Sequence, residues 1–168
     1  GHAIGQGEGF YLGVLEGDLV IDVARLAAAQ GLAAPDSMLG LIDEGPAGLK
    51  TLRRLLDKQG GVYPMGVSTA FANVSLLAPI PRPRKNIFGI GLNYVEHVAE
   101  SAQALDTAKE LPKQPVIFSK PPTTVVGPGA PIEHNSAITR QLDWEVELAV
   151  IIGTTARRVA KADALRHV

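Results

Sequence analysis

The chain has 168 residues, of which 46% are hydrophobic and 20% are charged, a balance typical of a globular protein of about one domain, or one domain with part of a second. Its formal net charge of -1 leaves no basic surplus for neutralising phosphates, so we expect no nucleic-acid partner. The absence of cysteine excludes disulfides, thiolate nucleophiles and thiolate metal sites, so any bound metal must be held by oxygen or histidine ligands.

The sequence carries no targeting or membrane signal that we recognise. Residues 1–9 are rich in glycine and lack the cationic stretch and long apolar core of a secretory signal. No apolar run approaches the roughly 20 residues that a membrane-spanning helix requires. We therefore expect a cytoplasmic protein with no membrane partner and a small neutral or anionic ligand.

The first half of the chain predicts a small unit of strands and helices. Residues 10–23 alternate around Glu16-Gly17-Asp18, which indicates a hairpin. A helix is predicted from Asp22 to Gln30, before Gly31, and a second short helix after Asp36 or Ser37. A third helix is predicted from Pro46 to Gly60-Gly61, with a core-facing leucine side made of Leu49, Leu52, Leu55 and Leu56.

A proline-rich segment divides the chain. Residues 78–85 carry three prolines, which remove backbone donors and favour extended geometry, so the segment is predicted to be a linker. We expect an N-terminal α/β domain over residues 1–79 and a second domain over residues 80–168, whose first strand begins at Asn86.

A histidine and a glutamate follow that strand at helical spacing. Residues 86–91 predict a short buried strand, and Asn93 is suited to cap a helix from Tyr94 to about residue 104. His97 and Glu100 are three residues apart, so on a helix the carboxylate can orient the imidazole for proton transfer. The alternative is a solvated surface pair, which is common on ordinary helices.

Two further features of this region are candidates for ligand binding. Gly89-Ile90-Gly91 begins like a dinucleotide-binding fingerprint, but the third glycine would fall at position 94, where Tyr94 stands. Lys120 follows a predicted strand over residues 115–119 and could pair with a substrate carboxylate. Its alternative role is a solvated charge at the end of a strand.

Residues 142–152 predict a strand with an acidic patch. One face is wholly apolar, and the other begins with Asp143, Glu145 and Glu147. Same-face neighbours lie roughly 6.7 Å apart at the backbone, so the side chains of Glu145 and Glu147 can converge on one cation. Oxygen ligands favour Mg²⁺, Mn²⁺ or Ca²⁺. The alternative is an amphipathic strand with a solvated acidic end.

Three segments in order, residues 89–100, 115–122 and 142–153, resemble the fumarylacetoacetate hydrolase family. The resemblance covers residues 86–168 and implies a divalent-metal enzyme, with Mg²⁺ (or Mn²⁺ or Ca²⁺) as cofactor, that hydrolyses, isomerises or decarboxylates small oxo-acids. It implies that His97 and Glu100 form a catalytic dyad on a helical lid. It also assigns Glu145 and Glu147 as metal ligands with Asp143 outside the ligand set. We further expect Tyr94 and Lys120 to bind the substrate.

The resemblance also implies the fold and its incompleteness. We expect an α+β protein whose small N-terminal α/β domain precedes an incomplete mixed β-roll or barrel of the fumarylacetoacetate hydrolase type. The family pattern continues beyond the helix predicted from about Ala160, and its third metal ligand would lie past residue 168. We therefore expect little activity from this chain alone, which would need its missing C-terminal part or a homodimer partner. A different hypothesis is a non-catalytic fragment that serves as an assembly or binding module.

Overall fold

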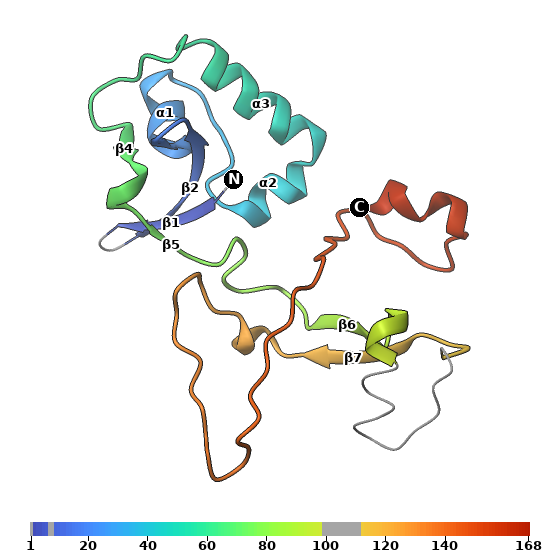
Figure 1. The fold of residues 1–168 in the computed structure, drawn as a ribbon. Coiled ribbons are helices and arrows are strands. Elements are labelled where there is room, and N and C mark those ends of the chain that lie inside the picture. The colour runs from blue at the N-terminus through green and yellow to red at the C-terminus, as the bar shows by residue number, and fades with distance from the viewer. Residues whose placement is uncertain (1, 7–8, 99–111) are drawn as a thin grey trace. The chain divides into compact units, whose positions relative to one another are not determined.

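The computed structural model describes residues 2–6, 9–98 and 112–168 (Figure 1). It forms two compact units, one made of residues 1–80 with 127–168 and the other of residues 81–126. The predicted mixture of helices with small sheets is confirmed, whereas no roll or barrel is formed by the described residues. The predicted domain division near residue 80 stays a prediction.

The first unit is built on an antiparallel sheet with the strand order β4-β3-β2-β1-β5. The predicted hairpin is confirmed as β2 and β3, which pair up to Glu16 opposite Leu19. Gly17 lies in the turn with a φ of 57°, a left-handed conformation that glycine adopts at little cost. The strands are β1 (His2–Gln6), β2 (Gly9–Glu16), β3 (Leu19–Asp22), β4 (Ser68–Ala70) and β5 (Ser75–Leu76).

Three helices connect β3 to β4, and each begins where the sequence predicts. The Asp22 carboxylate caps the first by accepting a hydrogen bond of 3.0 Å from the backbone N–H of Arg25. The Ser37 hydroxyl caps the second through the N–H of Gly40. Pro46 is the first residue of the third, where a backbone N–H is not needed. The helices are α1 (Val23–Ala29), α2 (Met38–Glu44) and α3 (Pro46–Asp57).

The core of this unit lies between the helices and the sheet face that carries Leu12 and Ile21, both at most 1% exposed. Leu52 and Leu55 of α3 pack into it, whereas Leu49 is 48% exposed. The prediction that Leu49 belongs to the core face is wrong. It lies roughly 90° around the helix axis from the buried line through Gly48, Leu52 and Leu55.

A tyrosine ties the loop after α3 to the end of β2. The Tyr63 hydroxyl donates a hydrogen bond to the Glu16 carboxylate. Burial, this hydrogen bond and the charge of Glu16 together raise the pKa of Tyr63 to about 12. The phenol is therefore held in its neutral form over the ordinary pH range.

The second unit contains an antiparallel hairpin of β6 (Ile87–Gly91) and β7 (Val116–Lys120), with Ile87 opposite Lys120 and Gly91 opposite Val116. Both predicted strands are thus confirmed, but the prediction that the first is buried is wrong, because Ile87, Phe88 and Ile90 of β6 are exposed. A short helical stretch over residues 95–98 follows β6. Three short 3-10 helices lie elsewhere in the described chain: η1 (Phe71–Asn73) and η3 (Lys161–His167) in the first unit, and η2 (Pro122–Thr124) in the second.

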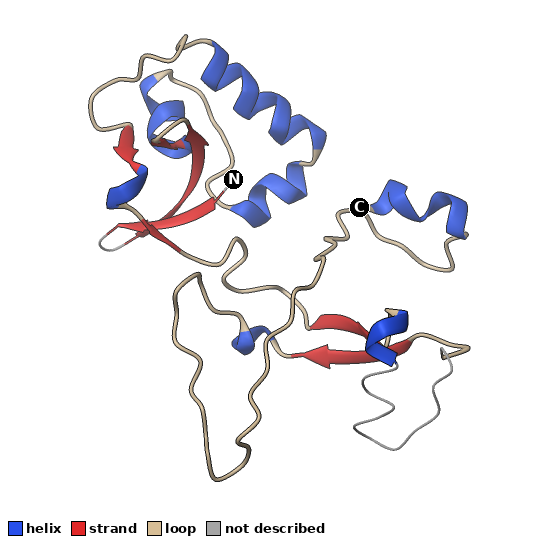
Figure 2. Cartoon of the chain, viewed as in Figure 1, coloured by secondary structure: helices blue, strands red, loops and turns tan. Residues whose placement is uncertain are grey.

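Residues 127–168 run mostly as loop (Figure 2). Gly127 lies against the backbone of residues 76–78, where an added Cβ would come within 3.2 Å of three backbone atoms. The helix predicted from about Ala160 is the short 3-10 helix η3, whose residue His167 accepts backbone hydrogen bonds from Gly153 and Thr154. No helix among residues 2–6, 9–98 and 112–168 is long and apolar enough to cross a membrane.

Candidate functional site

The two glycines of β6 make room for an aromatic ring. A Cβ built at Gly89 would lie 2.7 Å from Cε1 and Cε2 of Phe118 and closer still to Cζ, so the ring occupies the space that a side chain would fill. A Cβ at Gly91 would meet the same ring at 3.7 Å. The glycines are therefore explained by packing across the hairpin, which agrees with rejection of the dinucleotide reading.

The chain turns sharply after β6 and enters the helix that carries His97. Leu92 has a φ of 53°, a left-handed conformation that is uncommon outside glycine. Residues 95–98 are helical, and the backbone N–H of Val98 donates to the carbonyl of Tyr94 at 3.0 Å. Tyr94, rather than the predicted Asn93, is therefore the capping residue, because the turn at Leu92 delays the helix by one position.

The candidate catalytic dyad is described only in part. Val98 is 4% exposed and anchors the first turn of the helix, and His97 beside it is half-buried. Glu100 lies outside the described residues. The pairing of His97 with Glu100 therefore stays a prediction.

The two candidate substrate-binding residues lie at opposite ends of the hairpin. Lys120 pairs with Ile87, four residues before Gly91, so the strands separate the two ends by roughly 13 Å. Tyr94 follows the Gly91 end and is 57% exposed. The hairpin does not bring Tyr94 and Lys120 together. The ammonium of Lys120 instead lies 5.6 Å from the centre of the Phe118 ring, a cation–π contact.

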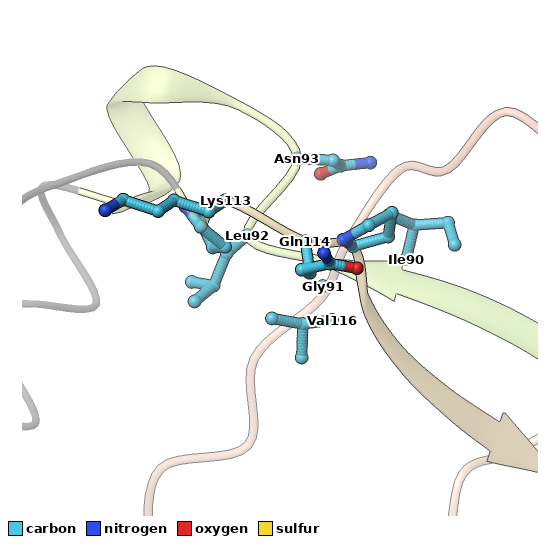
Figure 3. A pocket seen from close by; sticks show the side chains of 9 residues that line it. Ile90, Gly91, Leu92, Asn93, Lys113, Gln114 and Val116 are labelled. Carbon is cyan, nitrogen blue, oxygen red and sulfur yellow. The ribbon is translucent and has the colours of Figure 1, made fainter.

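A pocket of about 290 Å³ lies at the Gly91 end of the hairpin (Figure 3). It contains three polar side chains, those of Asn93, Lys113 and Gln114, among apolar ones. Lys113 and Gln114 could not be predicted as site residues, since a lysine and a glutamine between two prolines carry no recognisable signal. The pocket is lined by Ile90, Gly91, Leu92, Asn93, Pro112, Lys113, Gln114, Pro115 and Val116.

The predicted strand over residues 142–152 does not form. The segment has no strand partner within the described part of the chain, and all of its residues are exposed, with Leu148 at 85%. Asp143 accepts a 2.8 Å hydrogen bond from the backbone N–H of Trp144. A strand is held by hydrogen bonds to a neighbour, so an alternating sequence without a neighbour stays irregular.

The candidate metal ligands Glu145 and Glu147 lie in that exposed segment, in the unit that does not contain His97. Their carboxylate chemistry fits a hard divalent cation. The described residues nevertheless contain no group of three or more acidic, histidine or cysteine side chains close enough to hold a metal ion. Their role as ligands therefore stays a prediction.

The second half of the chain matches a known family. Residues 86–168 fit the model for the C-terminal part of fumarylacetoacetate (FAA) hydrolase, and they include the strand, turn and helix around His97 and the acidic segment. The chain therefore belongs to the fumarylacetoacetate hydrolase family, as the sequence resemblance predicted.

Several characterised proteins are similar to most of the chain. Oxaloacetate tautomerase YisK of Bacillus subtilis is 38% identical over 80% of this chain, and the human mitochondrial oxaloacetate tautomerase FAHD2A is 36% identical over 80%. The solved fumarylacetoacetate hydrolase from the psychrophile Exiguobacterium antarcticum is 31% identical over 99% of this chain, with a TM-score of 0.64. The chain spans only 44%, 38% and 51% of these proteins, respectively.

Proposed function

We propose that the chain provides part of the active site of a divalent-metal-dependent enzyme that acts on small oxo-acids by moving a proton beside a keto group. The main support is the placement of His97 in the first turn of a helix that follows the sharp turn at Leu92, within the region that matches the family. Oxaloacetate tautomerase activity, named for the relatives, favours isomerisation over hydrolysis or decarboxylation as the reaction.

The proposed reaction needs a group that takes a proton and a group that gives one, and one side chain can do both in turn. In keto–enol exchange, a base removes a proton from the carbon beside the keto group, the electron pair forms a carbon–carbon double bond, and the keto oxygen receives a proton. An imidazole nitrogen can accept a proton and return it, so His97 is suited to both steps. Glu100 would orient the ring through the other nitrogen, as its spacing of three residues allows.

Glu145 and Glu147 would hold the divalent cation. When bound, such an ion supplies Lewis-acid stabilisation of the negative charge that develops on the keto oxygen. Mg²⁺ is the ion we propose, with Mn²⁺ or Ca²⁺ as alternatives for the same oxygen ligands. Lys120 would bind a substrate carboxylate, although its position at the far end of the hairpin from Tyr94 argues against their sharing one small substrate.

The proposed active site requires more polypeptide than these 168 residues. Residues 142–152 alternate apolar and other residues as a buried strand does, so we propose that they pair within a larger β-roll or barrel. The relatives are about twice as long, which supports a partner made of further family sequence, either in the same protein or in a homodimer. The small oxo-acid would bind in the assembled site.

A second candidate function is assembly without catalysis. The apolar side chains of residues 142–152 are 44–85% exposed, and exposed apolar surfaces of this kind are typical of protein interfaces. Under this alternative the acidic side chains would serve solubility, and metal would have no effect on association.

Metal binding separates the two candidates. Isothermal titration with Mg²⁺ of this chain assembled with the further family sequence proposed above should give saturable binding that is lost when Glu145→Gln and Glu147→Gln are combined. Glu133→Gln, a matched change at another exposed glutamate, should leave binding intact. Equal binding by the double variant and the control would refute the ligand assignment. Unchanged partner association in the double variant would support the assembly module.

A further inference from the structure

The pocket at the Gly91 end of the hairpin has no role in the function proposed above. It lies beside Tyr94 and the first turn of the His97 helix, because Asn93 both lines the pocket and directly precedes Tyr94. Its volume of about 290 Å³ is just below the range of small-molecule sites, roughly 300 to 1,000 Å³. A short-chain acid is the size of ligand that such a pocket accepts.

The polar groups of the pocket are two carboxamides with a lysine nearby. Figure 3 shows the amide groups of Asn93 and Gln114 on one side, with the ammonium of Lys113 extending away from them. Each amide NH₂ can donate hydrogen bonds to an anionic oxygen, and neither repels it. The apolar walls from Ile90, Leu92 and Val116 suit a short carbon chain.

The backbone that presents Asn93 is constrained. The left-handed Leu92 (φ 53°) costs free energy that the surrounding structure must offset, and conformations of this kind gather at ligand sites. In the segment that leads into β7, Pro112 and Pro115 flank Lys113 and Gln114, and proline limits the conformations of its neighbours. Both amides are thus carried on restricted backbone.

We propose that Asn93 and Gln114 are positioning residues that bind the terminal carboxylate of a dicarboxylic oxo-acid, the end remote from the reacting keto group. This inference rests on the proposed function for the identity of the ligand. It assigns the recognition of the second carboxylate to two neutral amides at this end of the hairpin, rather than to Lys120 at the other end.

The test uses two acids that cannot tautomerise and that differ by one carboxylate. Malate carries the terminal carboxylate and lactate lacks it. Amide NMR signals of Gly91, Leu92, Asn93 and Gln114 in the ¹⁵N-labelled chain are followed during titration with each acid, first without Mg²⁺. We expect saturable shifts with malate at these signals and weaker binding of lactate.

Variants then test the two amides. Gln114→Ala should weaken malate binding about fivefold, as expected for one net hydrogen bond, and leave lactate binding unchanged. Gln114→Glu should weaken malate binding further, because a second negative charge repels the ligand. Gln59→Ala, the same chemical change in the other unit, is the control and should have no effect.

The outcomes separate this inference from the proposed function. The inference is overturned if malate leaves the four signals unmoved, or if Gln114→Ala combined with Asn93→Ala binds malate as tightly as the unchanged chain does. Failure of the proposed function has a different signature, in which Mg²⁺ fails to alter ligand binding by the chain assembled with further family sequence, while the metal-free malate shifts at the pocket persist.

Discussion

The packing of the N-terminal core can be tested with two leucines of α3 that the sequence pattern assigns to the same core-facing side. Leu55 is 1% exposed, whereas Leu49, six residues earlier on α3, is 48% exposed. Leu55→Ala removes about three carbon groups, which cost ~2.4 kcal/mol in transfer free energy, and the cavity that remains adds up to ~2 kcal/mol. Leu49→Ala forfeits roughly half of the transfer cost, about 1 kcal/mol, and leaves no cavity.

Urea denaturation followed by far-ultraviolet circular dichroism measures both changes in the free energy of unfolding. We expect Leu55→Ala to lose about 2 kcal/mol more than Leu49→Ala. If Leu55→Ala does not fold at all, Leu55→Val gives a smaller loss with the same ranking against Leu49→Val. Equal losses at the two positions would contradict the packing of α3 described above.

Two further changes test a hydrogen bond and a close contact. The pKa of Tyr63 is raised from 10.0 to about 12, so the stabilisation that the neutral phenol contributes is complete below pH 10 and is lost as the pH rises through 12. The urea midpoint of the unchanged chain should therefore fall more between pH 10 and pH 12 than the midpoint of Tyr63→Phe. Equal falls in the two proteins would contradict the raised pKa. Gly89→Ala should displace the Phe118 ring and destabilise the hairpin by about 1–3 kcal/mol, seen as faster amide exchange in β6 and β7, whereas Gly153→Ala, where an added Cβ meets nothing within 4 Å, should leave this exchange unaltered. Unchanged exchange in Gly89→Ala would mean that the ring does not lie over β6.

The N-terminal unit was largely predictable because its signals are local. Asp22, Ser37 and Pro46 each mark a helix start through chemistry within three residues, and Gly17 marks the turn by its own conformational freedom. The error at Leu49 came from counting leucines at helical spacing without knowing which line of α3 would face the sheet.

The candidate site was less predictable because its features depend on partners distant in sequence. The alternation of residues 142–152 indicates that the segment forms a strand when a partner strand lies beside it, but the described chain contains no partner strand for it. The His97 helix begins one residue later than predicted because Leu92 has a left-handed backbone conformation. A leucine in the sequence does not indicate such a conformation. Gln114 belongs to the site because it lies beside the end of β6 in the structure, and no sequence motif indicates this position.

The pairing of β5 with β1 has a consequence for synthesis of the protein. The last strand of the N-terminal sheet, Ser75–Leu76, hydrogen-bonds to the first strand rather than to its neighbour in sequence. During translation, the edge of β1 that pairs with β5 therefore stays unpaired until residue 76 has left the ribosome. Deleting residues 2–6 would leave β5 without a partner strand, whereas ending the chain before residue 75 would leave β1 paired with β2 alone.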